Sequence, residues 1–424
     1  MTPPRTAPPV RLRGSVIAPS KDGTARLYAD AVLELQNGRI ATLRAPNSHT
    51  AVNVSDRDPP PSRRLLFPGF VDLHCHWPQS HVRGQFAGAL LPWLRASIWP
   101  AEATFRDTAV ASQRARAFVD DVLRAGTTAG LFFGPPFLDA SLQFLATAPH
   151  GMFDGPALME TECSAALQTS AVEVLDAIAA LPALQRRRLS IAPRFAPNLT
   201  LDGLRACGVE AERLGLLAQS HLSENLDEVA WVRSLYPEAQ DYTDAYDRAG
   251  LLGEHVVMAH AIHLSDRELA RLAETRTMIA HCPTSNEALG SGRMPLERLR
   301  EAGVQWVLAT DVGAGPQLSQ LDAMGAFLRH HEAAGVSVSA VEALTRATAV
   351  PGAWLAKQDS ELAGLGTLNE GAPAHVIAYP LPEVEMTSKN AAETVLRALL
   401  DALSPNFEDA AQEVWCWGRR VVGA

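Results

Sequence analysis

Two histidines stand two residues apart where an apolar stretch ends, in the segment FPGFVDLHCH at residues 67–76. Alternate residues of a β-strand share one face, so His74 and His76 would point to the same side and Cys75 to the other. Two imidazoles on one face form half of a site for Zn²⁺ or Fe²⁺. We interpret Cys75 as a small buried apolar side chain rather than a third ligand.

Three more side chains that could bind a metal lie at the ends of predicted strands. They are His221 in LAQSHLSEN, His260 in VVMAH and Asp311 in VLATD. Glu224 follows His221 by three residues, where strand is expected to give way to helix. Imidazoles from three strands with one carboxylate would leave a coordination position for water, which is typical of a catalytic metal site.

Arg194 and Phe195 end another predicted strand, after Pro193. An arginine at such a place could pair with carboxylates of the protein or bind a carbonyl group of a ligand. The residues alone leave both roles open.

Several other classes of enzyme lack their motifs in this chain. There is no H-E-x-x-H, G-x-S-x-G, Walker loop or G-x-G-x-x-G. An H-x-E occurs at residues 330–332, but no P-C-x-x-C follows it, so the cytidine-deaminase zinc signature is absent.

The elements that must position these side chains alternate between strand and helix. Helices are expected at 107–125, 170–180, 201–214 and 224–235, and from Ser265, where Glu268 completes a capping box. Buried strands are expected at 130–133, 189–194, 216–221, 256–260, 277–281 and 304–310. Such repetition predicts parallel strands covered by helices, and with roughly eight strands a closed (β/α)8 TIM-type barrel. Chemistry in that fold lies at the carboxyl ends of the strands.

Both ends of the chain are instead rich in short β segments. Residues 28–35 and 40–43 flank an Asn37-Gly38 turn, and 375–379 and 414–422 are strand-like. We therefore predict a small β-sandwich domain built from residues 1–66 together with 365–424, and a metal-dependent hydrolase barrel at residues 67–364.

Composition narrows the possible partners. The 424 residues are 47% hydrophobic and 20% charged with a net charge of −10, so neither nucleic acid nor an anionic membrane is an expected partner. The five cysteines form no C-x-x-C pair, which favours a reducing cytoplasm. No secretory signal is visible near residue 1, and no apolar run approaches the roughly 18 residues that span a membrane.

The chain resembles the amidohydrolase superfamily of metal-dependent hydrolases, through residues 68–76, His221, His260 and Asp311. Within it, the chain is similar to the guanine deaminases. That narrower likeness rests on segments between Trp93 and Val312, and the most specific lie within residues 219–265.

The resemblance implies that His74, His76, His221 and Asp311 bind one metal ion per chain, Zn²⁺ with Fe²⁺ as an alternative. Members with two metals bridge them with a carboxylated lysine at the end of the fourth barrel strand. Arg194 occupies that region here, and the only lysines are Lys21, Lys357 and Lys389. A single metal is therefore expected.

The resemblance also implies hydrolytic deamination of guanine to xanthine and ammonia by a metal-activated water. Glu224, Asp311 and His260 would act in catalysis. Gln79, Arg194, Phe195, His260 and Glu224 would bind the small purine substrate, and the enzyme would be a homodimer. A related deaminase or chlorohydrolase acting on another purine, cytosine or a triazine is the alternative within the superfamily. A non-catalytic barrel serving as a scaffold is the alternative from another class; the complete ligand set and Glu224 argue against it.

Overall fold

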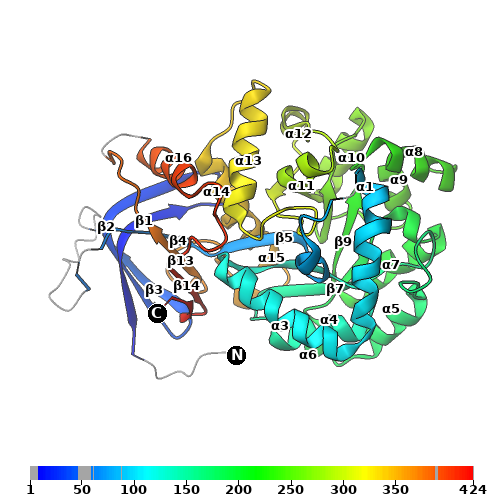
Figure 1. The fold of residues 1–424 in the computed structure, drawn as a ribbon, viewed down its shortest axis with the longest axis horizontal. Coiled ribbons are helices and arrows are strands. Elements are labelled where there is room, and N and C mark those ends of the chain that lie inside the picture. Colours follow the sequence, from blue (N-terminus) through cyan, green and yellow to red (C-terminus); the bar gives the residue numbers. More distant parts are fainter. Residues whose placement is uncertain (1–7, 46–58, 61, 87, 387–389, 424) are drawn as a thin grey trace.

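Two β-sheets organise the chain in the computed structural model (Figure 1). The structure describes residues 8–45, 59–60, 62–86, 88–386 and 390–423. Residues 1–7, 46–58 and 61 of the predicted β domain, and Lys389, lie outside the described residues. Within the described part of the chain, no helix is long and apolar enough to cross a membrane.

The larger sheet has eight parallel strands that follow one another in chain order. They are β5 (Phe70–His76), β6 (Thr127–Gly134), β7 (Met152–Leu158), β8 (Ser190–Pro193), β9 (Leu217–Leu222), β10 (Val256–His260), β11 (Met278–His281) and β12 (Trp306–Leu308). The backbone N–H of His76 donates to the carbonyl of Val312 (2.5 Å), and that of Asp311 donates to the carbonyl of His74 (2.9 Å). These bonds join the first strand to the segment after the last, and the predicted barrel is confirmed.

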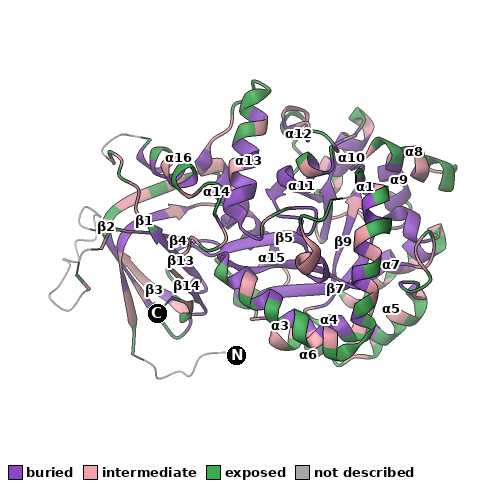
Figure 2. Ribbon diagram, viewed as in Figure 1, coloured by how far each residue is buried: buried purple, intermediate pink, exposed green. Residues whose placement is uncertain are grey.

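Helices cover the outside of the barrel, exposing their outer faces while the strands are buried (Figure 2). The longer ones are α3 (Thr108–Arg124), α4 (Leu138–Thr147), α5 (Ala171–Ala180), α7 (Leu201–Leu214), α8 (Leu226–Leu235), α10 (Asp266–Thr275), α12 (Leu296–Ala302), α13 (Gln320–Ala333), α14 (Ala340–Ala347) and α15 (Ala349–Leu355). Shorter helices are α1 (Leu90–Trp93), α2 (Trp99–Ala103), α6 (Ala183–Arg186), α9 (Tyr242–Asp247) and α11 (Pro283–Ala288). The capping box of Ser265 and Glu268 at the start of α10 is present as predicted.

The smaller sheet joins the two ends of the chain. Its seven strands lie in the order β15-β14-β13-β4-β1-β2-β3. They are β1 (Val10–Pro19), β2 (Ala25–Gln36), β3 (Arg39–Arg44), β4 (Arg64–Pro68), β13 (Val376–Pro380), β14 (Glu413–Cys416) and β15 (Arg419–Val422). Asn37 and Gly38 form the β2–β3 turn with positive φ angles of 52° and 79°, as an Asn-Gly turn requires. The two ends thus meet in one small β unit. Its division from the barrel as a separate domain stays a prediction.

Two features of the C-terminal segment differ from the sequence predictions. The strand-like stretch 414–422 is a hairpin, because Trp417 (φ 52°) and Gly418 (φ 69°) reverse the chain between β14 and β15. Helix α16 (Ala391–Leu403) was not predicted, although it buries Val395, Leu396 and Leu399 and packs on α14 and β2. The helix lies between two strand-like stretches, and its helical periodicity shows only when all of its residues are considered together.

The chain passes from the smaller sheet into the larger one at Gly69, between β4 and β5. An ideal Cβ at Gly69 would lie 2.2 Å from Oγ1 of the buried Thr128 and 2.8 Å from its Cγ2. The Gly69 N–H donates to the carbonyl of His375 (3.0 Å), which leads into β13. A residue without a Cβ is therefore needed where the small sheet meets the first barrel strand.

We predict that Gly69→Ala lowers the free energy of unfolding by about 1–3 kcal/mol, since the added methyl overpacks this junction. Urea or thermal denaturation measures the change. Gly325→Ala in α13 is the matched control, because its nearest neighbour would be Nη1 of Arg329 at 3.4 Å and alanine favours a helix. Equal stability of Gly69→Ala and the wild type would contradict the predicted close contact.

Candidate functional site

The predicted site residues come together at the carboxyl ends of the barrel strands. His74 and His76 end β5, His221 lies near the end of β9 and His260 ends β10, while Asp311 follows β12. Parallel strands direct these ends to one side of the barrel, so residues far apart in the chain become neighbours.

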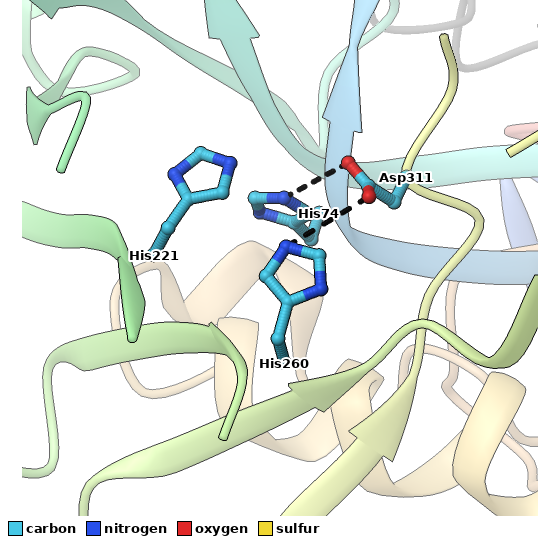
Figure 3. A group of neighbouring side chains, drawn as sticks. All are labelled: His74, His221, His260 and Asp311. Atoms are coloured by element: carbon cyan, nitrogen blue, oxygen red, sulfur yellow. Dashed lines mark ion pairs between the residues drawn. The ribbon is translucent and has the colours of Figure 1, made fainter. Parts of the chain in front are cut away.

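Four of these side chains form a tight group (Figure 3). One possible ligand atom from each of His74, His221, His260 and Asp311 lies within 4.8 Å of every other. Nε2 of His74 is 3.2 Å from Oδ1 of Asp311, and Nε2 of His260 is 3.8 Å from Oδ2 of the same carboxylate. His76 adjoins the group, with its Nε2 3.1 Å from Nε2 of His221 and 3.5 Å from Oδ1 of Asp311.

These separations can be compared with the size of a metal centre. Donor atoms about 2.0–2.1 Å from one tetrahedral zinc ion lie about 3.3 Å from one another. The contacts that link His74, His76, His221 and Asp311 cluster around that value, whereas His260 lies farther from Asp311 and also approaches Glu224 (Nε2 to Oε2, 3.5 Å). This geometry favours His76 over His260 as the third imidazole ligand, and the ligand set stays a prediction.

The protonation of the imidazoles fits a metal site. Nδ1 of His221 donates to the carbonyl of Arg194 (2.5 Å), which leaves a lone pair on Nε2. Among the described residues, neither ring nitrogen of the buried His74 has a hydrogen-bond partner. Burial lowers the pKa values of His74, His76 and His221, so the rings are neutral and able to bind a cation. Burial alone would raise the pKa of Asp311, but the close approach of Nε2 of His74 (3.2 Å) and the other nearby imidazoles lower it to about 2.

A buried carboxylate joins the two edges of the barrel beside this group. Asp72 accepts hydrogen bonds from Oγ1 of Thr310 (2.5 Å) and from the backbone N–H of His74 (3.1 Å). Burial raises the pKa of Asp72 to about 7. Asp72 was not among the predicted site residues, although an acidic residue within an apolar strand is a signal that it needs a partner.

Glu224 lies beside the group, fully buried. Its Oε1 accepts from Oγ of Ser291 (3.1 Å), and burial raises its pKa to about 7. Helix α8 is capped instead by Asn225 and Glu228, which form a capping box. The Glu224 side chain therefore takes no part in capping helix α8.

His260 is held by a residue that the sequence analysis did not single out for a role. Its Nδ1 donates to Oδ1 of Asn286 (2.9 Å), which directs Nε2 towards Glu224 and Asp311. Burial lowers the pKa of His260, but the two carboxylates outweigh burial and raise it above its usual value.

A cavity opens onto this histidine–aspartate group. All the predicted substrate-binding residues line it, together with an apolar wall that was not predicted. The lining consists of His76, Gln79, Leu90, Trp93, Leu94, Arg194, Phe195, His221, Glu224, His260, Leu289, Asp311 and Ala314. The apolar residues of α1 and its neighbours were missed because short helices over a barrel mouth carry no periodic pattern.

Arg194 fulfils one of the two roles considered for it. Its Nη1 donates to Oε2 of Glu102 at 2.6 Å, in a pair that is almost wholly buried. Since Arg194 also lines the cavity, contact with a ligand remains open to it. Neither Lys21 nor Lys357 lines this cavity, and the number of metal ions stays a prediction.

The sequence is similar to curated deaminases. It is 35% identical over 293 residues to guanine deaminase of Escherichia coli (strain K12), in an alignment covering 67% of this chain and 67% of that protein. It is 38% identical over 265 residues to a probable guanine deaminase of Deinococcus radiodurans, covering 61% of this chain and 60% of the relative. That alignment thus spans three fifths of the relative's length.

Solved structures match over nearly the whole chain. Guanine deaminase of E. coli superposes with a TM-score of 0.84 and 26% identity, covering 99% of this chain and 100% of that one. Guanine deaminase of C. acetobutylicum, solved with guanine bound in its active site, gives a TM-score of 0.83 and 25% identity, covering 98% and 100%.

The model of the amidohydrolase family matches residues 65–400, which include the whole barrel and every residue of the site described above. With well over half of its length matched, and with the curated relatives agreeing, the chain belongs to the amidohydrolase family.

Proposed function

We propose that this chain hydrolyses guanine to xanthine and ammonia. The observation that carries the proposal is one cavity that combines the histidine–carboxylate group and Glu224 with Arg194 and Gln79. The first set suits hydrolysis of a C–N bond, and the second offers N–H donors to a carbonyl-bearing heterocycle. The relatives named as guanine deaminases support this choice of substrate.

We propose His74, His76, His221 and Asp311 as the ligands of one divalent metal ion, Zn²⁺ or alternatively Fe²⁺. Such an ion supplies, when bound, a water molecule whose pKa is lowered towards neutrality. Oδ2 of Asp311 faces His260 rather than His74, so it is the oxygen available to take a proton from the attacking water.

Glu224 would transfer the remaining protons, and His260 would stabilise the tetrahedral carbon's oxygen by a hydrogen bond. The water oxygen bonds to the purine carbon that carries the amine, and the C–N bond to that amine then breaks. A pKa of about 7 lets Glu224 both give and take a proton near neutral pH, first at the adjacent ring nitrogen and then at the leaving amine. Nε2 of His260 can donate a hydrogen bond to the oxygen at the tetrahedral carbon.

Arg194 and Gln79 would recognise the guanine carbonyl, and Phe195 would contact the ring. A buried donor left unpaired by an analogue without that carbonyl can give discrimination of roughly 10⁴–10⁵. Ammonia release from guanine, 8-oxoguanine, adenine, cytosine and triazines, with metal analysis of the same sample, tests the proposal. Turnover of a triazine or cytosine in preference to guanine would replace it by the related activity.

We also propose that the enzyme is a cytoplasmic homodimer, with neither nucleic acid nor membrane as a partner. The resemblance to the family supports the dimer, and the composition supports the rest. Light scattering on the purified protein measures the oligomeric state.

We predict that His74→Ala and His76→Ala each reduce bound metal well below about one ion per chain and abolish deamination, because each removes one proposed ligand. Metal analysis and ammonia release on one preparation check this. His330→Ala is the control, since His330 pairs with Glu287 outside the cavity. Two tightly bound ions per active wild-type chain would contradict the single-metal site.

We predict that Glu224→Gln folds, retains its metal and deaminates guanine at least about a hundredfold more slowly, because the amide cannot carry the proton. Single-turnover kinetics, metal content and melting temperature separate the effects. Glu238→Gln, at an exposed position, is the matched control. A wild-type rate with a lowered melting temperature would leave Glu224 with a structural role only.

A further inference from the structure

Three polar side chains beside the cavity form a buried series of hydrogen bonds. The backbone N–H of Gly313 donates to Oε1 of Gln79 (3.2 Å), and Nε2 of Gln79 donates to Oε1 of Glu102 (2.8 Å). Nη1 of Arg194 donates to the other oxygen of Glu102 (2.6 Å). Gln79, Arg194 and Glu102 are 1%, 3% and 0% exposed, so these hydrogen bonds lie away from bulk solvent.

The direction of each bond follows from the groups present. A backbone N–H can only donate, so the carbonyl of Gln79 must face Gly313 and its NH₂ must face Glu102. A guanidinium can only donate as well. Both oxygens of residue 102 must therefore accept, which a carboxylate does and an amide of the same size does not.

Glu102 itself does not line the cavity, whereas Gln79 and Arg194 do. It therefore acts on a ligand through those two residues. Its charge also matters, because an unpaired guanidinium at the cavity wall would attract anions, while the ion pair offers N–H donors with little net charge.

This distinction bears on the proposed reaction. Guanine is neutral at physiological pH, and replacement of its amine by a second exocyclic carbonyl oxygen gives a stronger N–H acid. The product is thus more prone to be an anion than the substrate. A charge-compensated arginine would bind the substrate without retaining the ionised product.

We propose that Glu102 is a positioning and specificity-determining residue: it fixes Gln79 and Arg194 and cancels the arginine charge, so that the cavity prefers a neutral oxopurine to an anionic one. This inference rests on the proposed function for its choice of ligands.

The test compares two ligands that share the carbonyl but differ in charge. Hypoxanthine is neutral and urate is an anion at neutral pH, and their binding to the metal-loaded protein is measured by calorimetry. Glu102→Gln should raise KM for guanine more than it lowers kcat, because the recognition donors lose their positions. It should also change the ratio of the two dissociation constants in favour of urate by at least on the order of tenfold, because a unit charge within about 12 Å contributes that much at an effective dielectric near 20.

Two further variants separate charge from structure. Glu102→Asp keeps the charge and should keep the wild-type ratio, even if its shorter side chain weakens both ligands. Glu102→Gln combined with Arg194→Gln removes both charges and should return the ratio towards the wild-type value, since loss of the carbonyl contact affects the two ligands alike.

An unchanged ratio in Glu102→Gln, or equal weakening of both ligands, would overturn the inference. If Glu102→Gln does not fold, the ratios of the hypoxanthine and urate dissociation constants in Glu102→Asp and in the double variant test the inference instead. Failure of the wild type to release ammonia from guanine would instead sink the proposed function, while the binding ratio would still report on Glu102.

Discussion

The site depends on closure of the barrel between its first and last strands. His74 and His76 lie on β5, whereas Asp311 follows β12, at the opposite edge of the same sheet. Two backbone hydrogen bonds and the carboxylate of Asp72 bring these edges together. Because a metal centre tolerates errors of only a few tenths of an ångström, the seam must be fixed by more than apolar packing. The buried Asp72 supplies that directional restraint, at the expense of placing a carboxyl group in the core.

The local pattern of the sequence was enough for the parts that act within one element. Alternation along β5 placed His74 and His76 on one side, and a capping box marked the start of α10. The (β/α)8 order then put the strand ends on one face without any knowledge of contacts. These features were predictable because each depends on residues within a few positions of one another.

The features that escaped prediction depend on contacts across the chain. Glu102 meets Arg194 across 92 residues, and Asp72 meets Thr310 across 238. Neither the amino-acid composition nor the periodicity of apolar residues carries information about such distant pairs. The contact between Glu224 and Ser291 likewise spans 67 residues. The family resemblance supplied the ligand set, since spacing alone did not distinguish His76 from His260.

The junction at Gly69 links assembly of the site to the far end of the chain. Strand β4 pairs with β13, and β5 begins directly after Gly69, whose N–H is bound by His375. During synthesis from the N-terminus, β4 emerges some three hundred residues before its antiparallel partner, at a ribosomal rate of roughly 5–20 residues per second. The strand that carries the two histidines therefore lacks one of its anchors for tens of seconds. A chain stalled before β13 contains all eight barrel strands but lacks the anchor that holds the first of them.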